Sequence, residues 1–98
     1  MTRFTIVVLP DAEADLRDAF LWYFEKSPLA ADAFGTEVDG AIDGLKETAG
    51  DWPKGDDEVR FYHLKHFPYT VRYEIAGSEV TVLAVAHQRR KPGFWKHR

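Results

Sequence analysis

The chain of 98 residues contains no cysteine. This absence excludes disulfide bonds, zinc sites built on thiolates and a cysteine nucleophile. It is also compatible with a reducing compartment, and we expect the protein in the cytoplasm. Long hydrophobic runs are missing as well, since the longest, Phe4–Leu9 and Val80–Ala86, have only the length of a strand. A membrane-spanning helix needs about 20 apolar residues, so no membrane segment is predicted.

Acidic side chains are scarce in the C-terminal part of the chain. Residues 59–98 carry 2 acidic and 8 basic side chains, whereas residues 1–58 carry 14 acidic and 5 basic ones. This distribution predicts a basic face of the kind that meets nucleic acids or acidic proteins. The alternative is that the two parts neutralise each other inside one domain. The chain length allows only that single domain, residues 1–98.

The first part of the chain predicts a strand and two helices. Phe4–Leu9 is an apolar, β-branched run that is typical of a buried strand. Pro10 suits the first turn of a helix, and apolar residues at helical spacing indicate a helix over Asp11–Lys26. Ser27-Pro28 is a second start signal, so the next helix is expected over Leu29–Thr48. The two helices should form a hairpin that lies on a sheet.

After a polar loop, the hydrophobic period changes from about 3.6 residues to two, which indicates strands. Three strands are expected, over Val59–Leu64, Tyr69–Ile75 and Val80–His87. Gly77-Ser78 fits a two-residue type II′ turn, so the last two strands should form an antiparallel hairpin. The last strand is apolar on both faces, and we place it in the interior of the sheet. The predicted fold class is α+β, with both helices packed on one face of a four-stranded sheet and a basic C-terminal tail.

The hairpin turn predicts which residues face each other across the last two strands. Counting from the turn, the predicted pairs are Ile75 with Val80, Tyr73 with Val82, and Val71 with Ala84. This face should receive the helices, so Arg72 and His87 should share the opposite, uncovered face. The register of the strand over 59–64 stays open. It decides whether Arg60 or its neighbours at 61 and 63 join Arg72 there.

The C-terminal segment interleaves cations with aromatic rings from His87 onward. Such a segment could hold phosphates and stack on bases, or anchor a protein partner. A solvated tail in which Trp95 folds back on the core is the simpler alternative. The histidines do not have the spacing of a metal site, and no phosphate-binding glycine loop is present, so we expect neither metal nor cofactor.

Several short motifs occur in an order that is shared with one family. They are Pro10-x-Ala12-x-x-Asp15-Leu16, Ala30-Ala31-x-x-Phe34, Val59-Arg60, Phe67-Pro68-Tyr69-Thr70-Val71-Arg72-Tyr73-Glu74 and Val80-x-Val82-Leu83-Ala84-Val85-Ala86-His87-x-x-Arg90. In these motifs, over nearly its whole length, the chain resembles the RelE/ParE superfamily of toxins from type II toxin–antitoxin, or plasmid-stabilisation, modules. The resemblance implies a growth-inhibitory toxin, neutralised by a cognate antitoxin that covers an exposed apolar groove.

The resemblance also implies one of two targets. RelE-like members cut mRNA in the ribosome, whereas ParE-like members inhibit DNA gyrase. This chain has Thr70 and Trp95 where the nuclease branch carries an arginine and a tyrosine, and an indole cannot exchange a proton as a phenol does. The ParE-like branch is therefore favoured. Its expected target-binding residues are Arg72, Arg89, Arg90, Lys91 and Trp95.

The alternative is a RelE-like endoribonuclease with Arg89, His87 and Arg60 as its catalytic core. His87 would act as the base, and an arginine would stabilise the charge on the phosphate. A non-toxic domain that binds a partner or nucleic acid is the remaining alternative.

Overall fold

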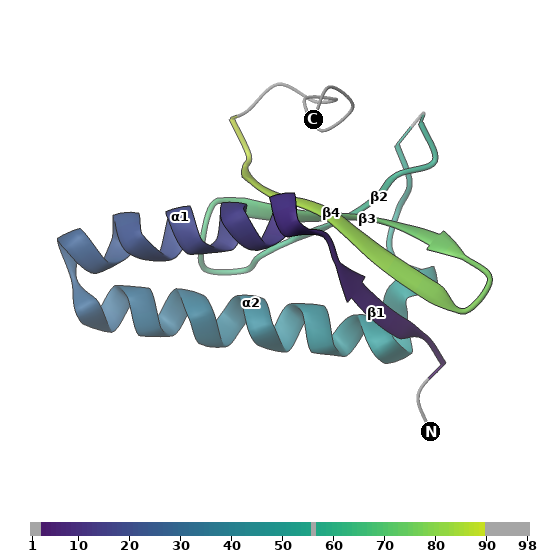
Figure 1. The fold of residues 1–98 in the computed structure, drawn as a ribbon, viewed down its shortest axis with the longest axis horizontal. Helices are drawn as coiled ribbons and strands as arrows, with labels where there is room; N and C mark the ends of the chain where they lie inside the picture. Colours follow the sequence, from purple (N-terminus) through teal and green to yellow (C-terminus); the bar gives the residue numbers. More distant parts are fainter. Residues whose placement is uncertain (1–2, 56, 90–98) are drawn as a thin grey trace.

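The computed structural model describes residues 3–55 and 57–89. The chain forms an α+β fold whose element order agrees with the prediction (Figure 1). The elements are β1 (Thr5–Val8), α1 (Pro10–Lys26), α2 (Pro28–Thr48), the short 3₁₀ helix η1 (Ala49–Asp51), β2 (Arg60–His63), β3 (Tyr69–Ala76) and β4 (Glu79–His87).

The four strands form one mixed sheet in the order β1-β4-β3-β2. Strand β4 therefore lies inside the sheet, as its apolar faces predicted. Strand β3 pairs antiparallel with both β2 and β4. Strand β1 pairs parallel with β4, and the pairing ends at Val8 opposite Val82. Beyond Val82, this edge of β4 lies beside α1 instead of β1.

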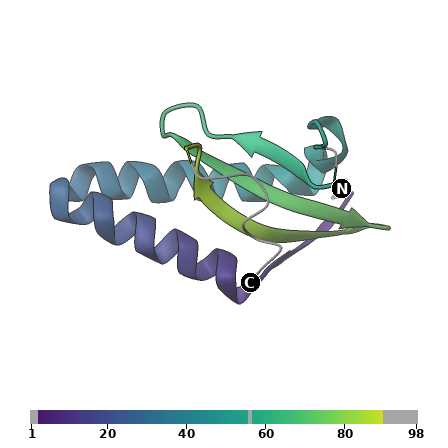
Figure 2. The ribbon, with the colours of Figure 1, turned by 90° about the horizontal axis from the view of Figure 1, so that it is seen from above.

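The two helices run antiparallel along one side of the sheet, and their connected ends project beyond it (Figures 1 and 2). The connection between the helices is short because Ser27 is both the C-cap of α1 and the N-cap of α2. Its N–H donates to the carbonyl oxygen of Tyr23 at 2.8 Å, which closes α1. Its side chain accepts from the N–H of Ala30 at 3.3 Å, which caps α2. We call the connected end the hairpin tip, and the end of α2 near η1 the hairpin base.

The hydrophobic core lies between the sheet and the two helices. Side chains of α2, including Phe34, Val38 and Leu45, pack with Val71 and Tyr73 of β3. The Tyr73 hydroxyl donates to the carbonyl oxygen of Ala49 at 2.7 Å. Burial raises the pKa of Tyr73 to about 12. The phenol therefore satisfies a buried carbonyl of η1 and ties it to the sheet.

The register of the β3–β4 hairpin is correct near the turn and wrong further away. Ile75 pairs with Val80 and Tyr73 with Val82, as predicted. Between Tyr73 and Arg72 the ladder contains a β-bulge, in which Leu83 is the extra residue of β4. Val71 therefore pairs with Val85, and the predicted pair of Val71 with Ala84 was wrong.

The bulge also overturns the prediction that Arg72 and His87 share a face. One inserted residue moves every later side chain of β4 to the other face of the sheet. His87 pairs with Tyr69 and its ring lies 5.4 Å from the Tyr69 ring, on the side of the helices. Arg72 lies on the uncovered face with Phe61, its partner in β2. The β2 register thus excludes Arg60 from that face.

Candidate functional site

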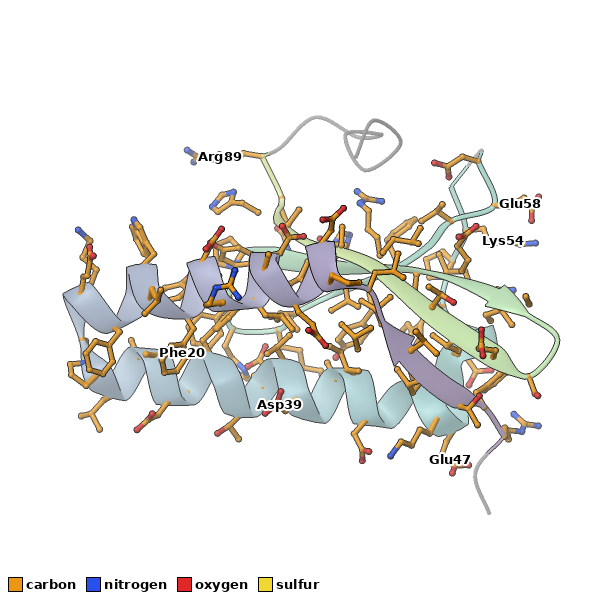
Figure 3. All side chains as sticks on the ribbon, in the orientation of Figure 1. Phe20, Asp39, Glu47, Lys54, Glu58 and Arg89 are labelled. Atoms are coloured by element: carbon orange, nitrogen blue, oxygen red, sulfur yellow. The ribbon has the colours of Figure 1, made fainter. Side chains whose placement is uncertain are left out.

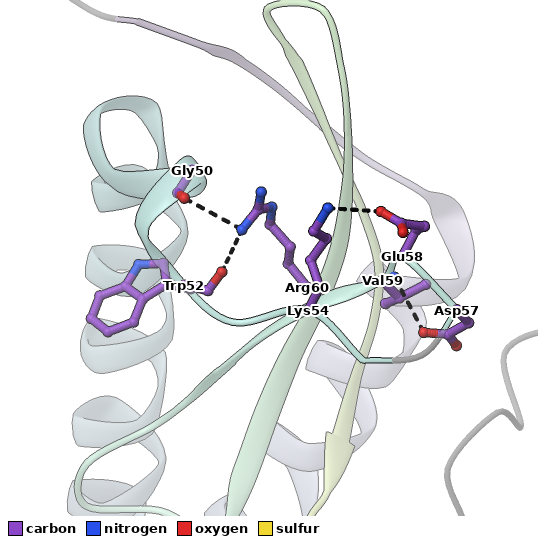
Figure 4. A network of polar contacts seen from close by, with 7 residues as sticks. All are labelled: Gly50, Trp52, Lys54, Asp57, Glu58, Val59 and Arg60. Atoms are coloured by element: carbon purple, nitrogen blue, oxygen red, sulfur yellow. Dashed lines mark hydrogen bonds and ion pairs between the residues drawn. The ribbon is translucent and has the colours of Figure 1, made fainter.

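The Arg60 side chain fastens the loop that precedes β2 (Figure 4). Its guanidinium donates to the carbonyl oxygens of Gly50 and Trp52, at 3.3 and 2.5 Å. In the same loop, Lys54 forms an ion pair of 2.8 Å with Glu58. The half-buried Arg60 therefore has a structural role at the hairpin base.

The uncovered face of the sheet presents Arg72 together with aromatic side chains. The guanidinium of Arg72 lies 5.6 Å from the centre of the Phe61 ring. Burial lowers the pKa of Arg72, and the charge of Asp57 acts in the opposite direction. On the same face, Nδ1 of His63 lies 2.6 Å from the buried hydroxyl of Thr70. A cation held against a ring is a suitable contact for an anionic or aromatic partner group.

The turn after β4 brings His87 and Arg89 together. The N–H of Arg89 donates to Nδ1 of His87 at 3.1 Å, and the N–H of Gln88 donates to the carbonyl oxygen of Pro68 at 2.9 Å. The Arg89 side chain points away from the sheet and the helices (Figure 3). The other predicted contacts in this segment lie outside the described residues: Arg90, Lys91 and Trp95.

Arg60 lies far from the other two residues of the predicted nuclease core. Arg60 pairs with Tyr73 from one side of β3, whereas His87 pairs with Tyr69 from the other side. Tyr73 and Tyr69 are four positions apart, which corresponds to roughly 13 Å along a strand. His87 and Arg89 are therefore neighbours, and Arg60 is separated from them by two strand spacings and by this distance.

A groove of about 530 Å³ lies between α1 and the open end of the β3–β4 hairpin, where β3 begins and β4 ends. We call it the acidic groove. It is lined by carboxylates and rings: Asp15, Asp18, Trp22, Tyr23, Tyr69 and His87. Burial raises the pKa of both tyrosines, and for Tyr23 the charge of Tyr69 adds to the effect. Both phenols therefore stay protonated at neutral pH, and the negative charge of the groove comes from its two aspartates.

Asp15 has a structural task in this groove in addition to its charge. Its Oδ2 accepts from the N–H of Val85 at 3.0 Å. That N–H belongs to the stretch of β4 that β1 no longer pairs, so the carboxylate replaces a missing strand partner. Asp18 is exposed on the next turn of α1. The two residues differ in role although both line the groove.

Another surface, which combines apolar and charged side chains, lies along α1 and α2 and extends to β1. A cavity of about 440 Å³ is lined by residues of both helices and of β1, among them Ile6, Leu16 and Ile42. A neighbouring cavity of about 300 Å³ shares Leu16 and continues toward Phe20. Near the tip, Leu21 is 51% exposed, Phe24 50% and Leu29 80%. We call these last three residues the tip residues.

The sequence reasoning missed the acidic groove. The available signal was the spacing of Asp15, Asp18 and Trp22, which places them on one face of a helix. Acidic residues on a predicted helix are usually solvated, however, and only the position of α1 beside β4 turns this face into one wall of a groove.

Residues 6–92 match the family model described as the ParE toxin of the type II toxin–antitoxin system parDE. The chain belongs to this family. A curated relative, Toxin RelE1 of Caulobacter vibrioides, is 28% identical over 86 residues, which are 86% of this chain and 92% of the relative. The RelE/ParE resemblance is thereby confirmed.

The fold of this ParE-family toxin also agrees with a solved structure. The chain superposes with a TM-score of 0.77 on a structure described as the chromosomal ParDE TA system from P. aeruginosa. The match covers 87% of this chain and 96% of that chain, at 19% sequence identity. At this identity, the likeness concerns the fold alone.

Two further observations concern the described part of the chain. No helix within residues 3–55 and 57–89 is long and apolar enough to cross a membrane. The same residues contain no group of three or more His, Cys, Asp or Glu side chains arranged to hold a metal ion.

Proposed function

We propose that this ParE-family toxin arrests growth in the cytoplasm by inhibiting DNA gyrase, and that a cognate antitoxin neutralises it. The observation that carries the choice of target is the position of Arg60. Its guanidinium is engaged by the carbonyl oxygens of Gly50 and Trp52, far from His87. A nuclease site would need its base and its phosphate-binding cations around one scissile bond.

The proposed contact with gyrase is the basic segment that begins at Arg89. The segment 89–98 contains five basic and no acidic side chains together with Phe94 and Trp95. Arginine and tryptophan are frequent energetic anchors of protein interfaces. Arg72, on the uncovered face of the sheet, is the proposed additional contact.

The proposed binding surface for the antitoxin runs along the two helices and the β1 edge. Two cavities between α1 and α2, one of which is also lined by β1, offer apolar side chains together with charged ones, and the tip residues add further apolar surface. Among residues 3–55 and 57–89, strand β1 pairs only with β4, so in this part of the chain its second edge is available for an extended segment. An amphipathic helix or strand of the antitoxin would bury both features.

The gyrase proposal is tested with the purified chain in a plasmid supercoiling assay. The wild type should inhibit supercoiling, and the triple variant Arg89→Ala/Arg90→Ala/Lys91→Ala should lose the inhibition. Lys54→Ala is the matched control, because Lys54 is an exposed cation at the opposite end of the sheet. In cells, DNA synthesis should stop before protein synthesis. Full supercoiling at an excess of wild-type chain would refute the proposal.

A RelE-like nuclease is the second candidate, and the contact of His87 with Arg89 favours it. On this hypothesis, induced cells contain transcripts that are cut at ribosome-bound codons, and His87→Ala abolishes the cuts. Intact transcripts in arrested cells would exclude it. If expression of the chain without an antitoxin does not affect growth, the partner-binding alternative is favoured.

A further inference from the structure

The acidic groove lies at the point where the chain leaves the sheet. His87 ends β4 and lines the groove. The N–H of Gln88 is bonded to the carbonyl oxygen of Pro68, which also lines it. Arg89, the last described residue before the segment 90–98, therefore lies in the turn that directly follows the groove residue His87.

The groove and this segment are complementary in charge. Asp15 and Asp18 supply two carboxylates to the groove. The segment 90–98 contains four basic side chains, Arg90, Lys91, Lys96 and Arg98, and no acidic one.

The aromatic lining is complementary to the segment as well. Trp22 is 53% exposed, although Lys26 lies 5.3 Å from its ring centre, so a large ring surface faces water. Covering apolar surface contributes roughly 25 cal/mol for each Å² removed from water. Guanidinium groups and rings such as those of Phe94 and Trp95 are favourable partners for Trp22, Tyr23 and Tyr69.

We propose that the acidic groove is the docking site for residues 90–98 of the same chain. Because the segment is tethered at the rim, its effective concentration is about millimolar, and a weak contact suffices to hold it. The docking itself does not require gyrase as the target. If the segment also binds the target, as proposed above, the groove and the target compete for the same cations.

A spin label in the segment tests the docking in the full-length chain. The chain has no cysteine, so Gly93→Cys accepts a nitroxide at one site only. In ¹H–¹⁵N spectra, the label should selectively weaken the signals of three groove residues far from it in sequence: Ala19, the Trp22 indole N–H and Tyr23. Signals of α2, on the far side of the hairpin, should keep their intensity.

The charges of the groove provide the control pair. In the labelled chain, Asp18→Asn should restore the weakened signals, whereas Asp39→Asn should not. Asp39 is equally an exposed aspartate on a helix, but it lies on α2, away from the groove (Figure 3). Removing two of the four positive charges of the segment, with Lys96→Gln/Arg98→Gln, should change the signals in the same direction as Asp18→Asn. Salt at about 1 M should also restore the weakened signals, because the electrostatic screening length is then only about 3 Å.

The proposal is overturned if the label weakens no groove signal. It is equally overturned if Asp18→Asn and Asp39→Asn give the same pattern. Neither readout involves growth or gyrase, so a failure of the docking and a failure of the proposed function are distinguished.

Discussion

The two ends of the helical hairpin contain similar residues in opposite surroundings. At the base, Leu45 and Ala49 are 1% and 0% exposed, whereas Leu21 and Leu29 near the tip are 51% and 80% exposed. The difference arises because Leu45 and Ala49 lie in the core under the sheet, whereas the connected ends of the helices project beyond the sheet (Figure 1). Fully burying a large apolar side chain contributes about 1.5–3 kcal/mol, which the tip residues do not gain. The base therefore stabilises the fold, and the tip is available to a partner.

The largest expected effect comes from the core side of the hairpin. Phe34 is 1% exposed, and its ring lies 5.3 Å from the ring of Tyr23 and 5.4 Å from that of Phe67. Phe34→Ala should lower the free energy of unfolding by about 3–5 kcal/mol. Phe24→Ala removes the same ring from the tip and should cost less than about 1 kcal/mol. Equal urea midpoints of unfolding for the two variants would show that the buried ring and the ring at the tip contribute equally to stability, which would contradict this comparison.

The next effect concerns the bond between the sheet and the base. Tyr73→Phe removes the donor to the Ala49 carbonyl and should cost about 1–3 kcal/mol, because it leaves a buried acceptor unsatisfied. In the folded chain the pKa of Tyr73 is raised to about 12. Its contribution is therefore complete below about pH 10, the ordinary value, and is lost as the pH rises toward 12.

Urea titrations at a series of alkaline pH values check this behaviour. The wild type should lose stability above about pH 10 more steeply than Tyr73→Phe. Parallel curves for the two proteins would show that the phenol is not responsible for the alkaline loss.

A smaller effect is expected midway along α2. Glu37 accepts from the N–H of His66 at 3.0 Å and lies 2.6 Å from its ring Nδ1. Burial opposes ionisation of Glu37, but these bonds and the charge of His66 together lower its pKa. The stabilisation is thus present above the ordinary pKa of glutamate and is lost as the pH falls through the lowered value.

Glu37→Gln tests this contact between α2 and the β2–β3 turn. The variant should lose less than about 1 kcal/mol at neutral pH, because exposed ion pairs contribute little. Its stability should fall less than that of the wild type in acid. A variant with the acid sensitivity of the wild type would contradict the assignment.

The smallest effect on stability, and the largest on binding, is expected at the tip. Leu21→Asp/Leu29→Asp should change the free energy of unfolding by no more than about 1 kcal/mol, since both side chains are exposed. The variant should nevertheless escape neutralisation by the antitoxin. Co-expression with the cognate antitoxin measures this, with Lys54→Ala as control, because Lys54 is exposed and lies outside the proposed surface. Continued neutralisation would remove the tip residues from the proposed surface.

The sequence by itself determined the elements and the family. Pro10, the Ser27-Pro28 signal and Gly77 act on their own backbone, so the helices and the last turn could be placed from local chemistry; Gly77 indeed has φ of +60°. The motif order sufficed for the RelE/ParE resemblance because it spans nearly the whole chain.

Only the tertiary structure decided which functional candidates meet. The bulge at Leu83 places His87 on the helix side of the sheet. The register of β2 places Arg60 where its guanidinium donates to the carbonyl oxygens of Gly50 and Trp52. The position of α1 beside the part of β4 that β1 does not reach created the acidic groove around Asp18. Each of these depends on contacts between residues far apart in the chain, which leave no periodic or local signal in the sequence.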